Sequence, residues 1–305
     1  MKNNAFNIPV TPKSPFAIYP AEKVKVVQNN DICDTQILSY TDELVILTIN
    51  EMLFATDTLL HELFLQLYPE QADINEISTS LNKLFAAGYL SKIELISPME
   101  ISVVEVYKIG TQGELFLETV EKEANLLEYL NGLDAIGIKK ILAALQLVIS
   151  QNYSQRAKSI IVSSIVSNTN SSKKNDKIFR PVARVNFDSE TIFIESVRRT
   201  ENSIADLIAK LKRMNSVLSY PEPFDIDIKL EQKITVILIT EDDSHMEELR
   251  KILDENNKKY CFNIILTNDV EINTAPKTCL HPHERKISNF EMMLSSIAKV
   301  IFEGV

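Results

Sequence analysis

One stretch restricts the fold more than any other, residues 178–213, which has the pattern strand, turn, strand, helix. An apolar-rich run at 178–187 and a β-branched run at 191–197 flank the polar turn Asp188-Ser189-Glu190. Apolar residues then recur at helical spacing from Ile204 to Met214. This order predicts two paired strands followed by a helix that packs against them.

Two further apolar runs extend the predicted sheet. Residues 234–240 and 260–266 are short and continuously apolar, as in strands that are buried on both faces, and a helix is predicted between them at 246–255. An alternation of strand, helix and strand indicates an α/β layered arrangement. We expect residues 121–305 to form a mixed β-sheet flanked by helices, with a buried helix at 133–150 and an amphipathic helix at 288–302.

The first part of the chain has a different pattern. Helices are predicted at about 41–54, 57–68 and 73–88, followed by strands at 92–97 and 102–109. Three helices and a hairpin within about 80 residues are the order of a winged helix. The fold class expected for residues 38–120 is therefore a winged helix, within a two-domain α+β or α/β chain. Residues 1–37 predict an extended arm, in which 24–27 could add a short edge strand.

Composition excludes several classes of protein. The chain has only 6 glycines, and it contains no Gly-rich phosphate loop, nucleophile elbow or zinc-protease motif. No apolar stretch approaches the roughly 20 residues that span a bilayer, and the first residues lack a hydrophobic signal core. Three widely spaced cysteines predict reduced thiols. We expect a cytoplasmic protein that does not contact membranes.

Charge is distributed unevenly along the chain. Residues 38–120 contain three basic and thirteen acidic side chains, so this segment accounts for the whole net charge of −10. Residues 173–213 contain ten basic and six acidic side chains. Lys and Arg supply most of the non-specific affinity for DNA. The basic segment is therefore one candidate nucleic-acid surface, and a dispersed set of solvated charges is the alternative.

Two pairs of motifs carry a resemblance to a known family. The first pair is similar to the third helix and the wing exit of winged helices, and consists of residues 81–90 (LNKLFAAGYL) and 107–113 (YKIGTQG). The second pair is similar to paired strands of PD-(D/E)XK nucleases, and consists of residues 179–182 (FRPV) and 193–201 (FIESVRRTE). Over residues 40–270 the chain resembles the replication-relaxation family of mobile-element proteins of Gram-positive bacteria. That resemblance implies a winged helix joined to a nuclease-like domain.

The same positions argue against nuclease chemistry. An active nuclease of this type uses an Asp after the Pro, and then an acid and a Lys on the next strand, to hold Mg²⁺ and polarise water. Val182 and Val197 occupy the Asp and Lys positions, and only Glu195 remains. One carboxylate cannot supply the several oxygen ligands that Mg²⁺ requires. We therefore expect no catalytic residue, no metal and no cofactor.

Three other polar features have both a functional and a simpler interpretation. Glu195 could be the remnant of a metal site, but pairing with Arg180, Arg184 or Arg198, or exposure at the end of the sheet, is the simpler account. The segment 279–284 (CLHPHE) has zinc-ligand residue types without a second chelating pair, and a surface linker is favoured. Asp242 and Asp243 could form an acidic pocket at a strand end, but a helix N-cap explains them more simply.

The expected function is that of a non-catalytic DNA-binding or regulatory accessory protein of a plasmid, phage or conjugative element. The candidate DNA contacts are Ser80, Asn82 and Lys83 on the third helix and Lys173, Lys174, Arg180, Arg198 and Arg199 in the basic segment. The alternative is a protein-interaction or self-assembly module in which the acidic winged helix binds a partner protein. Expected partners are thus DNA, a second protein or further copies of the chain.

Overall fold

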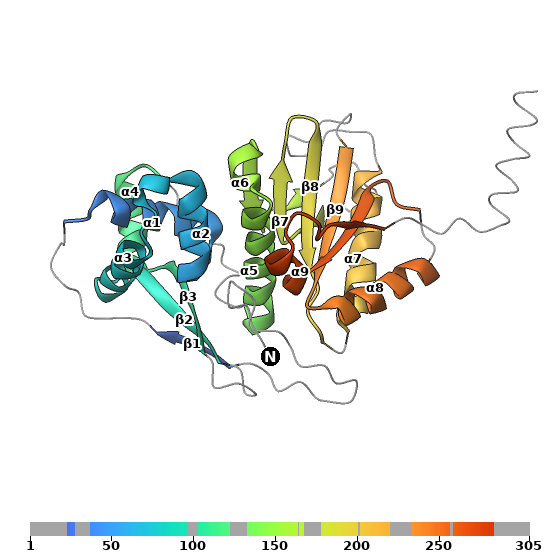
Figure 1. Cartoon of the computed structure of the whole chain (residues 1–305), viewed down its shortest axis with the longest axis horizontal. Coiled ribbons are helices and arrows are strands. Elements are labelled where there is room, and N and C mark those ends of the chain that lie inside the picture. Colours follow the sequence, from blue (N-terminus) through green and yellow to red (C-terminus); the bar gives the residue numbers. More distant parts are fainter. Residues whose placement is uncertain are drawn as a thin grey trace, which may run out of the picture.

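The structure is a computed structural model of the 305-residue chain. It describes residues 23–27, 37–96, 103–122, 133–163, 165–167, 178–200, 202–219, 233–256 and 259–283. Figure 1 shows an N-terminal unit of helices and a small sheet beside a larger layered unit, with one long helix between them. The chain is therefore an α+β protein with mixed sheets, in agreement with the predicted class.

The N-terminal unit contains the three predicted helices and the predicted hairpin, in the predicted order. Its helices are α1 (Tyr40–Met52), α2 (Asp57–Leu67), α3 (Ile74–Ala86) and α4 (Thr111–Thr119), with a short 3-10 turn at Pro69–Gln71. Polar caps start the first three, because side chains of Ser39, Thr56 and Asp73 accept hydrogen bonds from backbone N–H groups of the first turn.

A three-stranded antiparallel sheet closes this unit, in the order β1-β2-β3. The hairpin consists of β2 (Leu90–Ile96) and β3 (Val103–Ile109), and β1 (Lys23–Val27) pairs along the outer edge of β2. Ala55 adds an isolated bridge to Tyr107. The edge strand expected at 24–27 is thus confirmed, and it extends the hairpin with residues from the predicted arm.

The two motifs that resemble a winged helix, residues 81–90 and 107–113, pack directly against each other. Gly88 has a positive φ of 76°, which lets the chain turn out of α3, and the Gly110 N–H donates to the Tyr89 carbonyl at 2.9 Å. A Cβ on Gly113 would lie 2.3 Å from that same Tyr89 oxygen. The glycines of both motifs are therefore needed for one close backbone contact.

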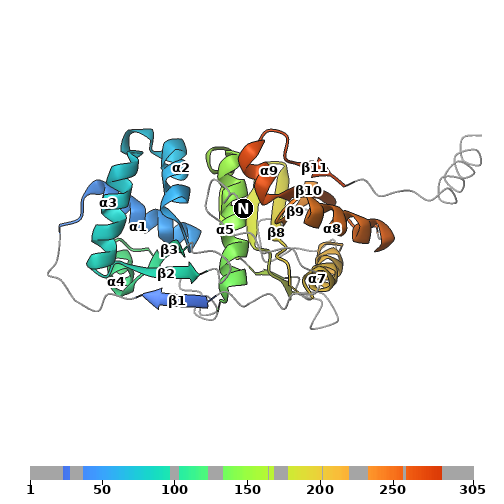
Figure 2. The same ribbon diagram turned by 60° about the horizontal axis from the view of Figure 1, so that its bottom comes forward.

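A single helix, α5 (Ala135–Ser150), lies between the N-terminal unit and the large sheet (Figures 1 and 2). Twelve of its 16 residues are buried, which means that apolar side chains leave the helix on nearly all sides. One apolar cluster includes Phe54 and Leu59 from the N-terminal unit, most of α5, and Ile194 and Ile237 from the sheet. The two units share this core.

The large sheet has six strands in the order β11-β10-β9-β8-β7-β4. Their bounds are β4 Ser159–Val162, β7 Ala183–Asn186, β8 Glu190–Ser196, β9 Lys233–Thr240, β10 Asn263–Asn268 and β11 His281–Pro282. β8, β9 and β10 run parallel, while β4, β7 and β11 join antiparallel to their neighbours. This is the predicted mixed sheet.

Helices cover both faces of this sheet. Ile192, Ile194, Ile237 and Ile239 point to the α5 side, where α9 (Asp269–Thr274) also lies. Phe193, Val236, Leu238 and Leu266 point to the opposite side, against α7 (Ser203–Leu218) and α8 (Asp243–Asn256). The period-2 alternation of apolar residues on both faces explains why these strands look continuously apolar in the sequence.

Several details differ from the sequence-based expectations. The strand predicted at 178–187 is interrupted at Arg180-Pro181-Val182. It forms β6 (Ile178–Phe179), which pairs with β5 (Val166–Ser167), and then β7. The short helix α6 (Tyr153–Arg156), β4 and α9 were not predicted. The amphipathic helix predicted at 288–302 lies outside the described residues. Among the described helices, none has the length and apolar character needed to cross a membrane.

Candidate functional site

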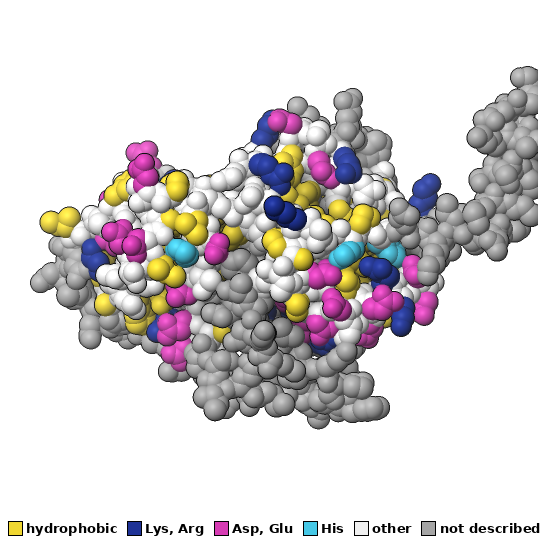
Figure 3. All heavy atoms as spheres, viewed as in Figure 1, with side chains coloured by type: hydrophobic (Ala, Val, Ile, Leu, Met, Phe, Trp, Pro, Cys, Tyr) yellow, Lys and Arg dark blue, Asp and Glu magenta, His cyan; other side chains and the backbone are white. Residues whose placement is uncertain are grey.

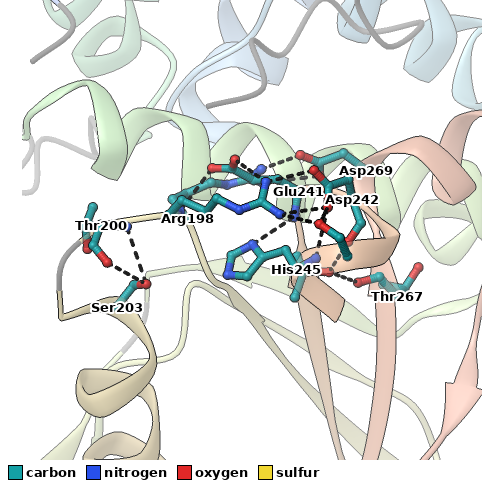
Figure 4. A network of polar contacts seen from close by, with 11 residues as sticks. Arg198, Thr200, Ser203, Glu241, Asp242, His245, Thr267 and Asp269 are labelled. Atoms are coloured by element: carbon teal, nitrogen blue, oxygen red, sulfur yellow. Dashed lines mark hydrogen bonds and ion pairs between the residues drawn. The ribbon is translucent and has the colours of Figure 1, made fainter. Parts of the chain in front are cut away.

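Polar side chains gather where the three parallel strands end. Arg198 and Arg199 follow β8, Glu241 and Asp242 follow β9, and Asp269 follows β10. The carboxyl ends of parallel strands meet at one edge of a sheet, which is where open α/β folds bind ligands. Figure 4 shows Arg198, Glu241, Asp242 and Asp269 within a network of polar contacts. We call this group the edge network.

The innermost contact of the edge network is a fully buried ion pair. The Arg198 guanidinium binds the Asp269 carboxylate through both terminal nitrogens, and both side chains have 0% relative exposure. Burial raises the pKa of Asp269, and the adjacent Arg198 opposes that rise. Gln146 of α5 donates to the Asp269 backbone carbonyl at 3.2 Å. This pair therefore ties β8, α9 and α5 together inside the protein.

A second ion pair lies closer to the surface. Arg199 Nη1 and Nη2 donate to the two Asp242 oxygens at 2.7 and 2.8 Å, and Ser244 Oγ accepts from Nη2 at 3.0 Å. The Arg199 backbone N–H donates to Glu241 Oε1 at 3.1 Å. Burial acts to raise the pKa of Asp242, but hydrogen bonds from Arg199, His245 and Ser244 outweigh burial and hold that pKa well below its ordinary value.

His245 completes the edge network from the first turn of α8. Its ring is buried, and its Nδ1 accepts a hydrogen bond from the Glu241 N–H at 3.4 Å. Burial, together with the positive charges of Arg199 and Arg198, lowers the pKa of His245 to about 4. The imidazole is therefore neutral at physiological pH, in a pocket whose cations are already matched by acids.

Glu195 lies apart from the edge network, on the α7 side of β8. Its Oε2 is 2.7 Å from Lys210 Nζ, and the side chain is only 4% exposed. Burial raises the pKa of Glu195, and Lys210 opposes the rise, with a smaller contribution from Lys140. The expectation that Glu195 pairs with a charged side chain is confirmed, but the side chain that binds its Oε2 is Lys210 of α7, which is not one of the three arginines expected.

Of the three positions that the resemblance aligns with a nuclease site, two lie side by side on paired strands, while Val182 and Val197 pack into apolar clusters on opposite faces of the sheet. Ala183 is paired with Ile194, and the Val182 N–H donates to the Ile194 carbonyl at 3.1 Å, so position 182 lies beside Glu195. Val197 continues the same strand and is buried among apolar residues.

The third-helix candidates are held by a different polar cluster. Asp42 of α1 is buried and accepts hydrogen bonds from Ser80 Oγ and Lys83 Nζ, both at 2.6 Å, and from the Ser39 N–H at 2.8 Å. Burial would raise the pKa of Asp42, but these hydrogen bonds, with Lys83 first, lower it below the ordinary value. Ser80 and Lys83 thus lock α3 to α1, and Asn82 alone of the three is exposed.

This lock predicts a large effect of removing its carboxylate. We expect Asp42→Ala to lower the free energy of unfolding by about 2–3 kcal/mol, because it removes the acidic member of the α1 capping box and leaves the buried Ser80 hydroxyl and Lys83 without their acceptor. Asp42→Asn keeps an acceptor and should cost less. Chemical denaturation measures both, and the exposed Glu118→Ala serves as the control, with a change within about 0.5 kcal/mol. A harmless Asp42→Ala would contradict the structural role.

The remaining DNA candidates lie in unlike environments. Arg198 and Arg199 are buried in ion pairs, which corrects the expectation that they present charge to a nucleic acid. Ser80 is likewise buried. Arg180 is half-buried between β6 and β7, and Lys173 and Lys174 lie outside the described residues. The structure therefore does not bring those candidates that lie within its described residues together on one exposed surface.

The two other polar motifs, Asp242-Asp243 and residues 279–284, have structural roles in the folded protein. Asp242 caps α8, since its Oδ1 accepts from the His245 N–H at 2.9 Å, as predicted. The segment around Cys279 is not a plain linker, because His281–Pro282 forms β11 and pairs with β10. Cys279 is buried, and His281 Nε2 lies 2.7 Å from Glu271. No three His, Cys, Asp or Glu side chains of the described residues are placed to hold a metal ion.

Sequence reasoning missed the edge network as a unit. Its signal was present, because charged residues directly follow successive parallel strands, as Arg198-Arg199 and Glu241-Asp242 do. Asp269 was not considered, since the third strand was expected to end at 266 and extends to Asn268. Comparisons of the chain with models of protein families, with curated proteins and with solved structures found no match.

Proposed function

We propose that this chain is a non-catalytic accessory protein that acts by binding a partner protein through its N-terminal unit. One observation carries the proposal. Lys83, the only cation of α3, is bound to the buried Asp42 in a unit with a large excess of acid. A recognition helix without available cations, in an acidic unit, lacks the phosphate contacts that dominate affinity for DNA.

The winged-helix and nuclease-like assignments belong to this proposal. The order of three helices and a hairpin, the Ala55–Tyr107 bridge and the hydrogen bond from the Gly110 N–H to the Tyr89 carbonyl support a winged-helix arrangement. The position of Val182 beside Glu195, and the pairing of Glu195 with Lys210, support a nuclease-like scaffold used without hydrolysis. By resemblance the host would be a plasmid, phage or conjugative element.

Binding to labelled DNA tests the proposal. We expect duplex DNA of mixed sequence to bind the full chain no more tightly than about 100 μM near physiological salt, at the weak end of non-specific binding. Plasmid DNA incubated with the protein and Mg²⁺ or Mn²⁺ should stay uncut. Sub-micromolar, steeply salt-dependent binding that is lost on replacing Lys173 and Lys174 by Ala would overturn the proposal in favour of DNA.

A further inference from the structure

One side of α1 carries two exposed residues, Tyr40 and Glu51, and two partly buried ones, Glu43 and Leu47, of which Leu47 also packs against the core of the unit. These four residues recur at intervals of three and four residues, so they form a stripe on one side of the helix. Val45, Ile46 and Ile49 point away from this side and are buried in the core of the unit, whereas Leu44, four residues after Tyr40, lies on the same side as the stripe and is also buried. The stripe alternates aromatic or apolar residues with acids.

Tyr68 at the end of α2 extends this stripe. Its ring packs edge-to-face on Phe64, with centroids 5.4 Å apart. Burial raises the pKa of Tyr68, and the charge of Glu51 and then Tyr40 add to the rise, which indicates that the three side chains lie in one region of the unit. Tyr40, Glu43, Leu47, Glu51 and Tyr68 are together called the α1 face.

The α1 face has the chemistry to bind a cationic and apolar surface. Tyr40 is 63% exposed, which is high for a large ring. Lys122 reaches Glu51 at 3.5 Å, but both side chains are about half-exposed, so that pair is weak and easily exchanged. Figure 3 shows the surrounding lobe with acidic and hydrophobic side chains and few basic ones. Aromatic rings beside carboxylates attract Lys and Arg.

We infer that the α1 face docks a basic amphipathic helix of a partner protein, which would lay Leu-type side chains on Tyr40, Leu47 and Tyr68 and place Lys or Arg beside Glu43 and Glu51. The inference rests on the proposed function and deepens it by naming the surface and the partner's chemistry. Charge complementarity selects this occupant, because DNA is repelled by the same acids and a second copy of the unit carries the same sign of charge.

Fluorescence anisotropy with a model helix tests the inference. The probe is a labelled amphipathic peptide of leucine and lysine, about 18 residues or five turns long, and its leucine–glutamate counterpart is the charge control. We expect the full chain to bind the lysine peptide and not the glutamate peptide. Tyr40→Ala combined with Leu47→Ala should weaken binding about tenfold or more, since exposed aromatic anchors dominate such interfaces.

A matched variant separates this face from general attraction to an acidic protein. Leu115→Ala combined with Val120→Ala removes apolar area at exposed positions on α4 and at its C-cap, in the same unit, and should leave the affinity unchanged. Circular dichroism checks folding, and Tyr40→Ala alone is the milder variant if the double variant unfolds.

Three results would overturn the inference. If both double variants weakened peptide binding equally, or if neither weakened it, the peptide would bind elsewhere on the protein, and the proposed function would stand. A dimer in light scattering that Tyr40→Ala with Leu47→Ala converts to a monomer would assign the α1 face to self-association. Tight DNA binding without peptide binding would instead refute the proposed function itself.

Discussion

Replacing Arg198 with methionine is expected to lower the free energy of unfolding by about 3–5 kcal/mol. Arg198 and Asp269 are both fully buried, so the substitution leaves a carboxylate in the protein interior without its partner. Lys139 of α5 also acts on Asp269, which places the expected loss toward the lower end of that range. Such a loss is a large part of the roughly 5–15 kcal/mol that stabilises a typical domain.

Urea denaturation of three variants measures this effect. Arg198→Met with Asp269→Asn removes both charges and should recover part of the loss, because no unpaired ion remains buried. Arg213→Met changes an exposed arginine on α7 and should shift stability by less than about 0.5 kcal/mol. Equal stability of Arg198→Met and the wild type would mean that Arg198 is not buried against Asp269.

The second large effect is a dependence of stability on pH that comes from His245. Its pKa is about 4 in the folded protein and about 6.5 in an unfolded chain. Between these values the unfolded chain binds the proton and the folded protein does not, so stability falls as the pH drops from about 6.5 to about 4. The full difference corresponds to about 3 kcal/mol, and above pH 6.5 the effect vanishes.

His245→Asn isolates this contribution. The side-chain oxygen of asparagine can accept the hydrogen bond that the Glu241 backbone N–H donates, and asparagine does not take up a proton between pH 7 and pH 4. The unfolding free energies of wild type and variant, measured at steps from pH 7 to pH 4, should approach each other as the wild type loses stability. Glu195 has a raised pKa, so its protonation stabilises the folded state as the pH falls, which is opposite to the effect of His245. The difference in unfolding free energy between wild type and variant cancels this contribution, because both proteins contain Glu195. Parallel pH curves would rule out a depressed His245 pKa.

Periodicity predicted the regular elements well. The helices α1, α2, α3, α5, α7 and α8 and the strands β8 and β9 appear within a few residues of their expected bounds. Their apolar spacing and caps are local properties that the sequence displays directly. Short elements failed, because β4 and α9 have few residues and depend on the neighbours they pack against.

The partners of charged residues were less predictable than the elements. Arg198 and Arg199 were expected at a surface because arginine is usually exposed, but they contact Asp269 and Asp242, which are 71 and 43 residues away. Lys210 of α7 binds Glu195 of β8, which lies 15 residues earlier in the chain. Such pairs depend on which strand ends and helices meet, and that follows only from the order of strands in the sheet.

The position of α5 has a consequence for how this chain can vary. Since one helix supplies packing to both units, replacing either unit alone would leave one side of α5 without its apolar partners. Recombination that exchanged the first 120 residues for another module would have to bring a matching side of α5 with it. The two units are expected to be inherited together, and substitutions in either unit where it packs on α5 are expected to be accompanied by substitutions in that helix.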